Sequence, residues 1–96
     1  MTGAIASRIT AYAPSPHVNW TDTGGGLVVY DQQRGSYHEL NAVGSAIWRA
    51  LEGGRTREAV IERLAGLFDA DPAAISADVD PFLSSLLADG LIRPVT

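Results

Sequence analysis

The sequence predicts an α+β domain of the winged helix-turn-helix type, with a three-stranded antiparallel sheet followed by three helices. Two patterns predict this fold class. The first half of the chain has short segments of β-branched and aromatic residues between turn residues, and the second half has apolar residues at helical spacing between capping residues. The chain has 96 residues, which fits one domain over 1–96, and residues 1–16 are expected to be partly extended.

Proline and glycine divide the first half into extended segments. Ile5–Ala13 is a first extended segment, which Pro14 and Pro16 close because proline cannot donate to a strand ladder. Val18–Trp20 is either a short separate strand or the continuation of the first segment. A turn ending in three glycines follows, and Leu27–Asp31 is the clearest strand because it is rich in β-branched and aromatic residues.

The next segment is typical of a hairpin. Residues 32–35 form the connection, and the last of them, Gly35, suits a positive φ angle. The returning strand is Ser36–Leu40, and its side chains alternate between the two faces of the sheet, with Tyr37 and Glu39 on one face and His38 and Leu40 on the other. This strand contains no proline or lysine, so as a sheet edge it is open to pairing with another chain.

Capping residues mark two helices after the hairpin. Asn41 is the N-cap of the first helix, and Gly53 and Gly54 end it. The apolar face of this helix consists of Val43, Ala46, Ile47, Ala50 and Leu51. Thr56 caps the second helix, whose apolar stripe consists of Val60, Leu64, Leu67 and Phe68, with Ile61 alongside.

The third helix has Asp71 as its cap and Pro72 at its first position, and Gly90 ends it before a short apolar tail, Leu91–Ile92. Pro81 lies well inside this helix, where proline removes a hydrogen bond and clashes with the preceding turn. The apolar stripe continues past Pro81, so we expect a kinked or two-part helix rather than a loop. The stripe consists of Ile75, Val79, Phe82, Leu83, Leu86 and Leu87.

Composition argues against nucleic acid binding and catalysis. The net charge is −4, all seven basic residues are arginines, and acids crowd the last third, so a basic peptide or protein is a better electrostatic match than a nucleic acid. Because the chain lacks cysteine and His17 and His38 are not at metal-ligand spacing, we expect no metal and no cofactor, although a carboxylate-only site within residues 69–80 stays open.

The remaining chemical signals are weak. Gly44–Ala46 does not match a nucleophile elbow, so the chain is not expected to be an enzyme. No run is long enough to span a bilayer, and the N-terminus lacks the apolar core of a signal peptide. With the absence of cysteine, this predicts a cytoplasmic protein.

Several motifs together resemble the PqqD-like family of precursor-peptide recognition elements. The most specific is Leu40-Asn41 followed by Ala46-Ile47-Trp48, within the longer stretches Leu27–Asp31, Arg34–Asn41 and Gly44–Leu51. Compatible motifs over residues 17 to 93 are Thr56–Val60, Asp71-Pro72, Asp78–Leu83 and Asp89–Leu91. Tyr12-x-Pro14 and Pro16-His17-Val18 are similar to the free-standing leader-binding protein of lasso peptide biosynthesis.

The resemblance implies a non-catalytic module that binds the leader region of a ribosomally made, modified peptide. The leader would add as an antiparallel strand to the edge strand Ser36–Leu40 and place side chains in a groove against the third helix. It would then pass to a separate leader peptidase, and the core peptide to a cyclase.

The residues that the resemblance assigns to peptide binding come from the sheet and the third helix. They are Val29, Ser36, Tyr37, His38, Glu39, Leu40, Asp78, Val79, Phe82 and Leu86. Asp78 and Asp80 would face basic leader residues. Tyr37 and Leu40 point to opposite faces of a regular strand, so only one of them is expected to line the groove.

Other functions fit the same architecture. A winged-helix DNA-binding domain needs basic residues on a recognition helix. The third helix instead carries Asp78, Asp80 and Asp89, with no arginine before Arg93. A peptide chaperone for pyrroloquinoline quinone biosynthesis differs from the lasso protein only in its partner peptide. A small enzyme would need a catalytic constellation that only the fold brings together, and the oligomeric state stays open.

Overall fold

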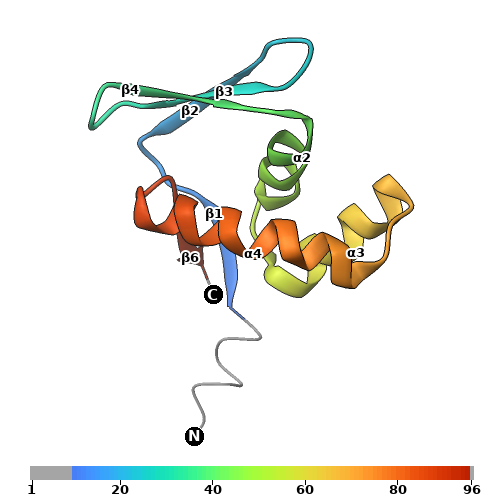
Figure 1. The fold of residues 1–96 in the computed structure, drawn as a ribbon. Coiled ribbons are helices and arrows are strands. Elements are labelled where there is room, and N and C mark those ends of the chain that lie inside the picture. The colour runs from blue at the N-terminus through green and yellow to red at the C-terminus, as the bar shows by residue number, and fades with distance from the viewer. Residues whose placement is uncertain (1–9, 96) are drawn as a thin grey trace, which may run out of the picture.

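The computed structural model describes residues 10–95, which form two small antiparallel sheets and three helices (Figure 1). This confirms the predicted α+β class with a three-stranded antiparallel sheet and three helices. In chain order the elements are β1 (Ala11–Pro14), β2 (Val18–Asp22), β3 (Leu27–Asp31), β4 (Ser36–Leu40), α2 (Ala42–Leu51), β5 (Arg55–Thr56), α3 (Arg57–Phe68), α4 (Pro72–Ala88) and β6 (Ile92–Val95).

The predicted sheet has the strand order β2-β3-β4, with every pair antiparallel. The register sets Leu27 opposite Leu40 and Asp31 opposite Ser36. Alternate residues of β3 are buried, because one face of this sheet packs against the helices. In the view of Figure 1, the sheet lies above α2, and α4 crosses the lower half of the molecule beside β6.

A second sheet, with the order β5-β1-β6, joins the two ends of the described chain. The sequence patterns did not predict it. Ile92, expected in an apolar tail, instead begins β6, and Ala11 lies between Thr56 and Val95. The expected extended segment Ile5–Ala13 overlaps β1, although its residues 5–9 lie outside the described part. Strands this short give no alternation from which their pairing could be read.

The three predicted N-caps are confirmed by hydrogen bonds. The Asn41 side chain accepts from the Gly44 N–H at 2.8 Å, and the Thr56 hydroxyl accepts from the Ala59 N–H at 3.2 Å. The Asp71 carboxylate accepts from the Ala73 N–H at 2.9 Å. Each cap satisfies a backbone donor that the first turn of a helix leaves without a partner.

The core lies between the β2-β3-β4 sheet and the three helices. Its largest fully buried side chain is Trp48, whose ring meets the Trp20 ring edge-on with centroids 5.4 Å apart. Two members of the predicted stripe of α3 were placed there wrongly, since Leu67 is 68% exposed and Phe68 is 42% exposed. They occupy the last turn of α3, after which the chain turns into α4, so the buried stripe ends at Leu64.

Helix α4 continues through Pro81 as one helix, so the two-part alternative is wrong. Proline removes only its own N–H from the helix, which leaves the Ala77 carbonyl without its usual donor. Val79 and Leu83, on either side of Pro81, are both buried and hold this part of the helix against the core.

Among residues 10–95, no helix is long and apolar enough to span a bilayer. Within the same residues, no three His, Cys, Asp or Glu side chains gather as metal ligands would.

Candidate functional site beside strand β4

Strand β4 forms one edge of its sheet. It pairs with β3 on one side, and within residues 10–95 no strand pairs with its other side. An unpaired edge presents backbone N–H and C=O groups that a further strand can bind.

The hydrogen bonds around β3 determine which backbone groups face β4. Along a strand, the N–H and C=O of one residue point to one side and those of the next residue to the other. The Gly26 oxygen accepts from the Thr23 N–H at 3.0 Å. The Gln32 N–H donates to the His17 oxygen, also at 3.0 Å. Even-numbered positions of β3 therefore face β2, and odd-numbered positions face β4.

The register transfers this alternation to β4, where Leu40, His38 and Ser36 lie opposite the odd-numbered residues of β3. These three residues therefore direct their backbone groups toward β3. A close approach agrees with this, because a Cβ added to Gly26 would lie 2.2 Å from the Leu40 oxygen. It follows that the N–H and C=O groups of Tyr37 and Glu39 point away from β3, toward the edge of the sheet.

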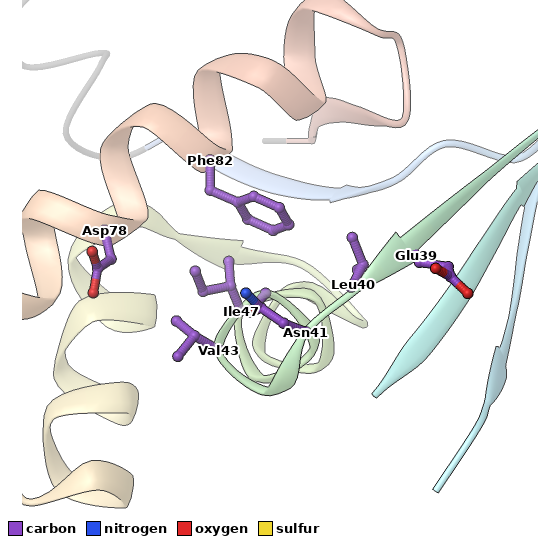
Figure 2. Close-up of a pocket in the computed structure, with 8 residues that line it drawn as sticks. Glu39, Leu40, Asn41, Val43, Ile47, Asp78 and Phe82 are labelled. Atoms are coloured by element: carbon purple, nitrogen blue, oxygen red, sulfur yellow. Dashed lines mark hydrogen bonds between the residues drawn. The ribbon is translucent and has the colours of Figure 1, made fainter. Parts of the chain in front are cut away.

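A groove of about 360 Å³ lies beside the C-terminal end of β4 (Figure 2). Strand β4, helix α2 and helix α4 all contribute to it, and its lining residues are Glu39, Leu40, Asn41, Val43, Gly44, Ile47, Asp78 and Phe82. Figure 2 shows the Phe82 ring projecting from α4 toward Leu40 and α2. The floor of the groove is formed by the apolar side chains of Leu40, Val43, Ile47 and Phe82, and it lies next to the outward backbone groups of Glu39.

Small residues at the start of α2 let the three elements approach each other. A Cβ added to Gly44 would lie 3.2 Å from Phe82 Cζ and 3.5 Å from Leu40 Cβ, so glycine makes room for the ring. The buried Ser45 hydroxyl donates to the Leu40 oxygen at 3.2 Å. This bond ties the end of β4 to α2.

Two acidic residues lie at the borders of the groove, and the Glu39 side chain points to the opposite face of the sheet from Leu40. Glu39 comes from β4 and Asp78 from α4, and Figure 2 shows them on opposite sides of the Phe82 ring. The residues that line the groove include no arginine or histidine. The site therefore suits an apolar side chain with a positive charge close by.

An ion pair links α3 to α4 outside the groove. Arg57 Nε and Nη2 donate to the two Asp80 carboxylate oxygens at 2.5 and 2.8 Å. The hydrogen bond from Arg57 lowers the pKa of Asp80, and the bond to Asp80 raises the pKa of Arg57. Asp80 is paired with Arg57 and does not line the groove, so Asp78 is the one of the two acids expected to face the leader that lines it.

Four of the predicted contact residues line the groove, namely Glu39, Leu40, Asp78 and Phe82. Three others are core residues, since Val29, Val79 and Leu86 are at most 3% exposed. Their assignment to peptide contact stays a prediction, because helical and strand periodicity locates an apolar face without showing whether another element of the fold covers it.

The other predicted residues lie along β4, away from the groove. Ser36 and His38 are half-buried on the same face as Leu40, and the Ser36 hydroxyl lies 3.2 Å from His38 Nε2. Tyr37 points to the opposite face, where it is 71% exposed and its ring centroid lies 4.7 Å from that of Tyr30. Of the pair Tyr37 and Leu40, it is therefore Leu40 that lines the groove.

Sequence reasoning missed the contribution of α2 to the groove, which comes from Asn41, Val43, Gly44 and Ile47. Asn41 was read as a cap and the two apolar residues as core. The sequence did contain one signal for this contribution, namely Gly44. The helix already ends at a glycine pair, so a further glycine in its interior often marks a place where another element packs closely against it.

Three solved structures are similar in fold. TbiB1 in complex with the TbiA(beta) leader peptide is 27% identical, with a TM-score of 0.78 over 88% of this chain and 98% of that chain. Lasso peptide synthetase B1 complexed with the leader peptide is 23% identical, with a TM-score of 0.74 over 86% of this chain and 98% of that chain.

The third is the solution NMR structure of the PqqD truncation of Methylobacterium extorquens PqqCD, described as a stand-alone recognition element for ribosomally synthesized and post-translationally modified peptides. It is 21% identical, with a TM-score of 0.72 over 86% of this chain and 88% of that chain. No curated protein sequence matches the chain significantly. The model of the family described as coenzyme PQQ synthesis protein D (PqqD) matches residues 26–92, which is more than half of the chain, and the chain therefore belongs to the PqqD family.

Proposed function

We propose that the protein binds the leader region of a ribosomally made precursor peptide by adding it as a strand to β4. The observation that carries this proposal is an edge strand that pairs with no further strand within residues 10–95, with a groove that has an apolar floor directly beside it. The likeness to TbiB1, whose structure contains a leader peptide, supports the same role. The motifs Tyr12-x-Pro14 and Pro16-His17-Val18 favour lasso peptide maturation as its setting.

Backbone hydrogen bonds and side-chain contacts would contribute differently to binding. An antiparallel leader strand would bond to the outward N–H and C=O groups of Tyr37 and Glu39, each bond contributing about 0.5–1.5 kcal/mol. These bonds are available to any sequence. Burying one large apolar side chain on the groove floor would add about 1.5–3 kcal/mol, which makes the groove the source of selectivity.

The proposed role is non-catalytic delivery. The Ser45 hydroxyl beside the groove is buried and already donates to a backbone oxygen, which leaves it no part in attack on a peptide. The bound leader would be presented to a separate leader peptidase and the core peptide to a cyclase. We place this step in the cytoplasm, where a ribosomally made precursor is first available.

A second partner peptide is favoured by the family match itself. The family is described by coenzyme PQQ synthesis, so a peptide chaperone for pyrroloquinoline quinone biosynthesis is the alternative within the same binding mode. DNA binding has less support, because Arg57 of α3 is held by Asp80 and Glu58.

The test is fluorescence polarisation with labelled leader peptides encoded beside this gene, compared with a labelled PQQ precursor peptide. A lasso leader that saturates the protein more tightly than the PQQ precursor supports the proposal, and the reverse order supports the alternative. If a folded sample binds neither peptide, the proposal is wrong, and a gel-shift assay with DNA becomes the next experiment.

A groove variant locates the binding. Val43, 36% exposed on the groove floor, lies in the first turn of α2, so Val43→Asp should keep the helix because a carboxylate there interacts well with the helix dipole. It should weaken leader binding about tenfold by removing apolar burial. Leu67→Asp, at an exposed apolar residue of α3, is the matched control and should bind like the wild type. Equal affinity for both variants would contradict the groove assignment.

A further inference from the structure

The face of the sheet turned away from the helices carries exposed side chains along the edge strand β4. Tyr37 is 71% exposed and lies against Tyr30, with ring centroids 4.7 Å apart. Glu39, two residues further along β4, is also exposed, and within residues 10–95 its carboxylate makes no ion pair. We call Tyr30, Tyr37 and Glu39 the outer row.

The outer row has a fixed relation to any strand added at this edge. The outward backbone groups belong to Tyr37 and Glu39, so the residues of an added antiparallel strand that lie opposite these two make the backbone bonds. Directly opposite residues of neighbouring strands place their side chains on the same face, with Cβ atoms about 4.5–5.5 Å apart. The bonding residues of the peptide would therefore set their side chains beside the outer row, while the residues between them face the groove.

We infer that the protein reads the leader on both faces of the extended sheet, with a basic residue opposite Glu39 and, two residues later, an aromatic or β-branched residue opposite Tyr37. This inference rests on the proposed function. Opposite charges and aromatic contacts are the cross-strand pairs that stabilise antiparallel sheets. The leader residue just before the basic one lies opposite Leu40, and its apolar side chain enters the groove.

The chemistry of the edge selects this occupant. Glu39 has no cation of its own in the described residues, so an opposing Lys or Arg gains an ion pair without breaking one. Tyr37 of the Tyr30–Tyr37 pair lies on the edge strand β4, so the pair offers a stacking surface to an aromatic side chain of an added strand. A peptide with an acidic residue opposite Glu39 would suffer repulsion, which gives discrimination as well as affinity.

The experiment is selection from an mRNA-displayed library of random peptides of about 20 residues, long enough for several strand registers. The wild type, Glu39→Lys and Glu52→Lys proteins are selected in parallel. Glu52→Lys is the matched control, because Glu52 is an exposed acid at the opposite end of α2 from the groove and its substitution changes the net charge equally.

The expected motif from the wild type is an apolar residue, then Lys or Arg, then any residue, then an aromatic or β-branched residue. Glu39→Lys should select Asp or Glu at the basic position, and Glu52→Lys should select the wild-type motif. In polarisation assays, exchanging the basic residue of a selected peptide for Glu should weaken binding to the wild type about fivefold and restore it on Glu39→Lys.

Two other outcomes would contradict either the two-face inference alone or the proposed function as well. Peptides that share the apolar anchor, lose affinity for Val43→Asp and show no preference opposite Glu39 and Tyr37 would refute the two-face inference and leave the proposed function standing. A selection that yields no peptide sensitive to Val43→Asp, from protein shown to be folded by circular dichroism, would overturn the proposed function and the inference with it.

Discussion

Replacing Gly44 by alanine separates the shape of the groove from the stability of the fold. Gly44 lies inside α2, where alanine is favoured over glycine by about 0.5–1 kcal/mol. The new methyl group would lie 3.2 Å from Phe82 Cζ and 3.5 Å from Leu40 Cβ. The first distance is shorter than an ordinary contact, so the half-buried Phe82 ring must shift by a few tenths of an ångström.

The two effects oppose each other in stability but not in binding. Overpacking costs about 1–3 kcal/mol in a closed core, and the low end applies here because the ring borders an open groove. The free energy of unfolding should therefore stay within about 1 kcal/mol of the wild type. A leader side chain that no longer fits the floor would lose about 1.5–3 kcal/mol of burial, which weakens binding roughly tenfold to a hundredfold.

Gly66→Ala is the control for this experiment. Gly66 is in α3, and a Cβ added there meets nothing within 4 Å, so this variant gains helix propensity without touching the groove. Urea denaturation should show Gly66→Ala more stable than the wild type by up to about 1 kcal/mol, and fluorescence polarisation should show its leader affinity unchanged. A folded Gly44→Ala protein that binds the leader as tightly as the wild type would refute the reasoning.

Two further predictions concern parts of the fold that hold the site. Gly26→Ala would bring its Cβ to 2.2 Å from the Leu40 oxygen and should cost about 1–3 kcal/mol of stability in urea denaturation. Gly25→Ala has open space around the added Cβ and should not lose this stability. Equal denaturation midpoints for the two variants would contradict the close approach. Asp80→Asn should cost at most about 1 kcal/mol at neutral pH, because the Arg57 pair is partly exposed. The folded pKa of Asp80 is lowered, so its contribution is present above the unfolded value of about 3.9 and is lost as the pH falls through the folded value. Denaturation midpoints of the variant and the wild type should therefore converge in acid, and a gap independent of pH would contradict the ion pair.

Local signals predicted the helices and the edge strand. Asn41, Thr56 and Asp71 act within one helical turn, so the residues that satisfy their side chains are close in sequence. The second sheet is the opposite case, because β1 pairs with β6 from the other end of the chain and β5 has two residues. No periodicity in such short strands indicates their partners.

The candidate site was predicted in part for the same reason. Alternation along β4 separates Leu40 from Tyr37 without knowledge of the fold, and the structure places Leu40 in the groove. Burial cannot be read in this way, since Phe82 and Val79 belong to the same apolar stripe and only Phe82 lines the groove. The orientation of the backbone also required the hydrogen bonds of β3, because the sequence gives no indication of which residues of an edge strand face outward.

Hydrogen exchange measured by NMR on the free and leader-bound protein tests strand addition most directly. The amides of Tyr37 and Glu39 point away from β3, so they should exchange quickly in the free protein and become protected when a saturating leader peptide is added. The amides of His38 and Leu40 face β3 and should be protected in both states. Saturating leader binding that leaves the exchange of Tyr37 and Glu39 unchanged would contradict strand addition at β4.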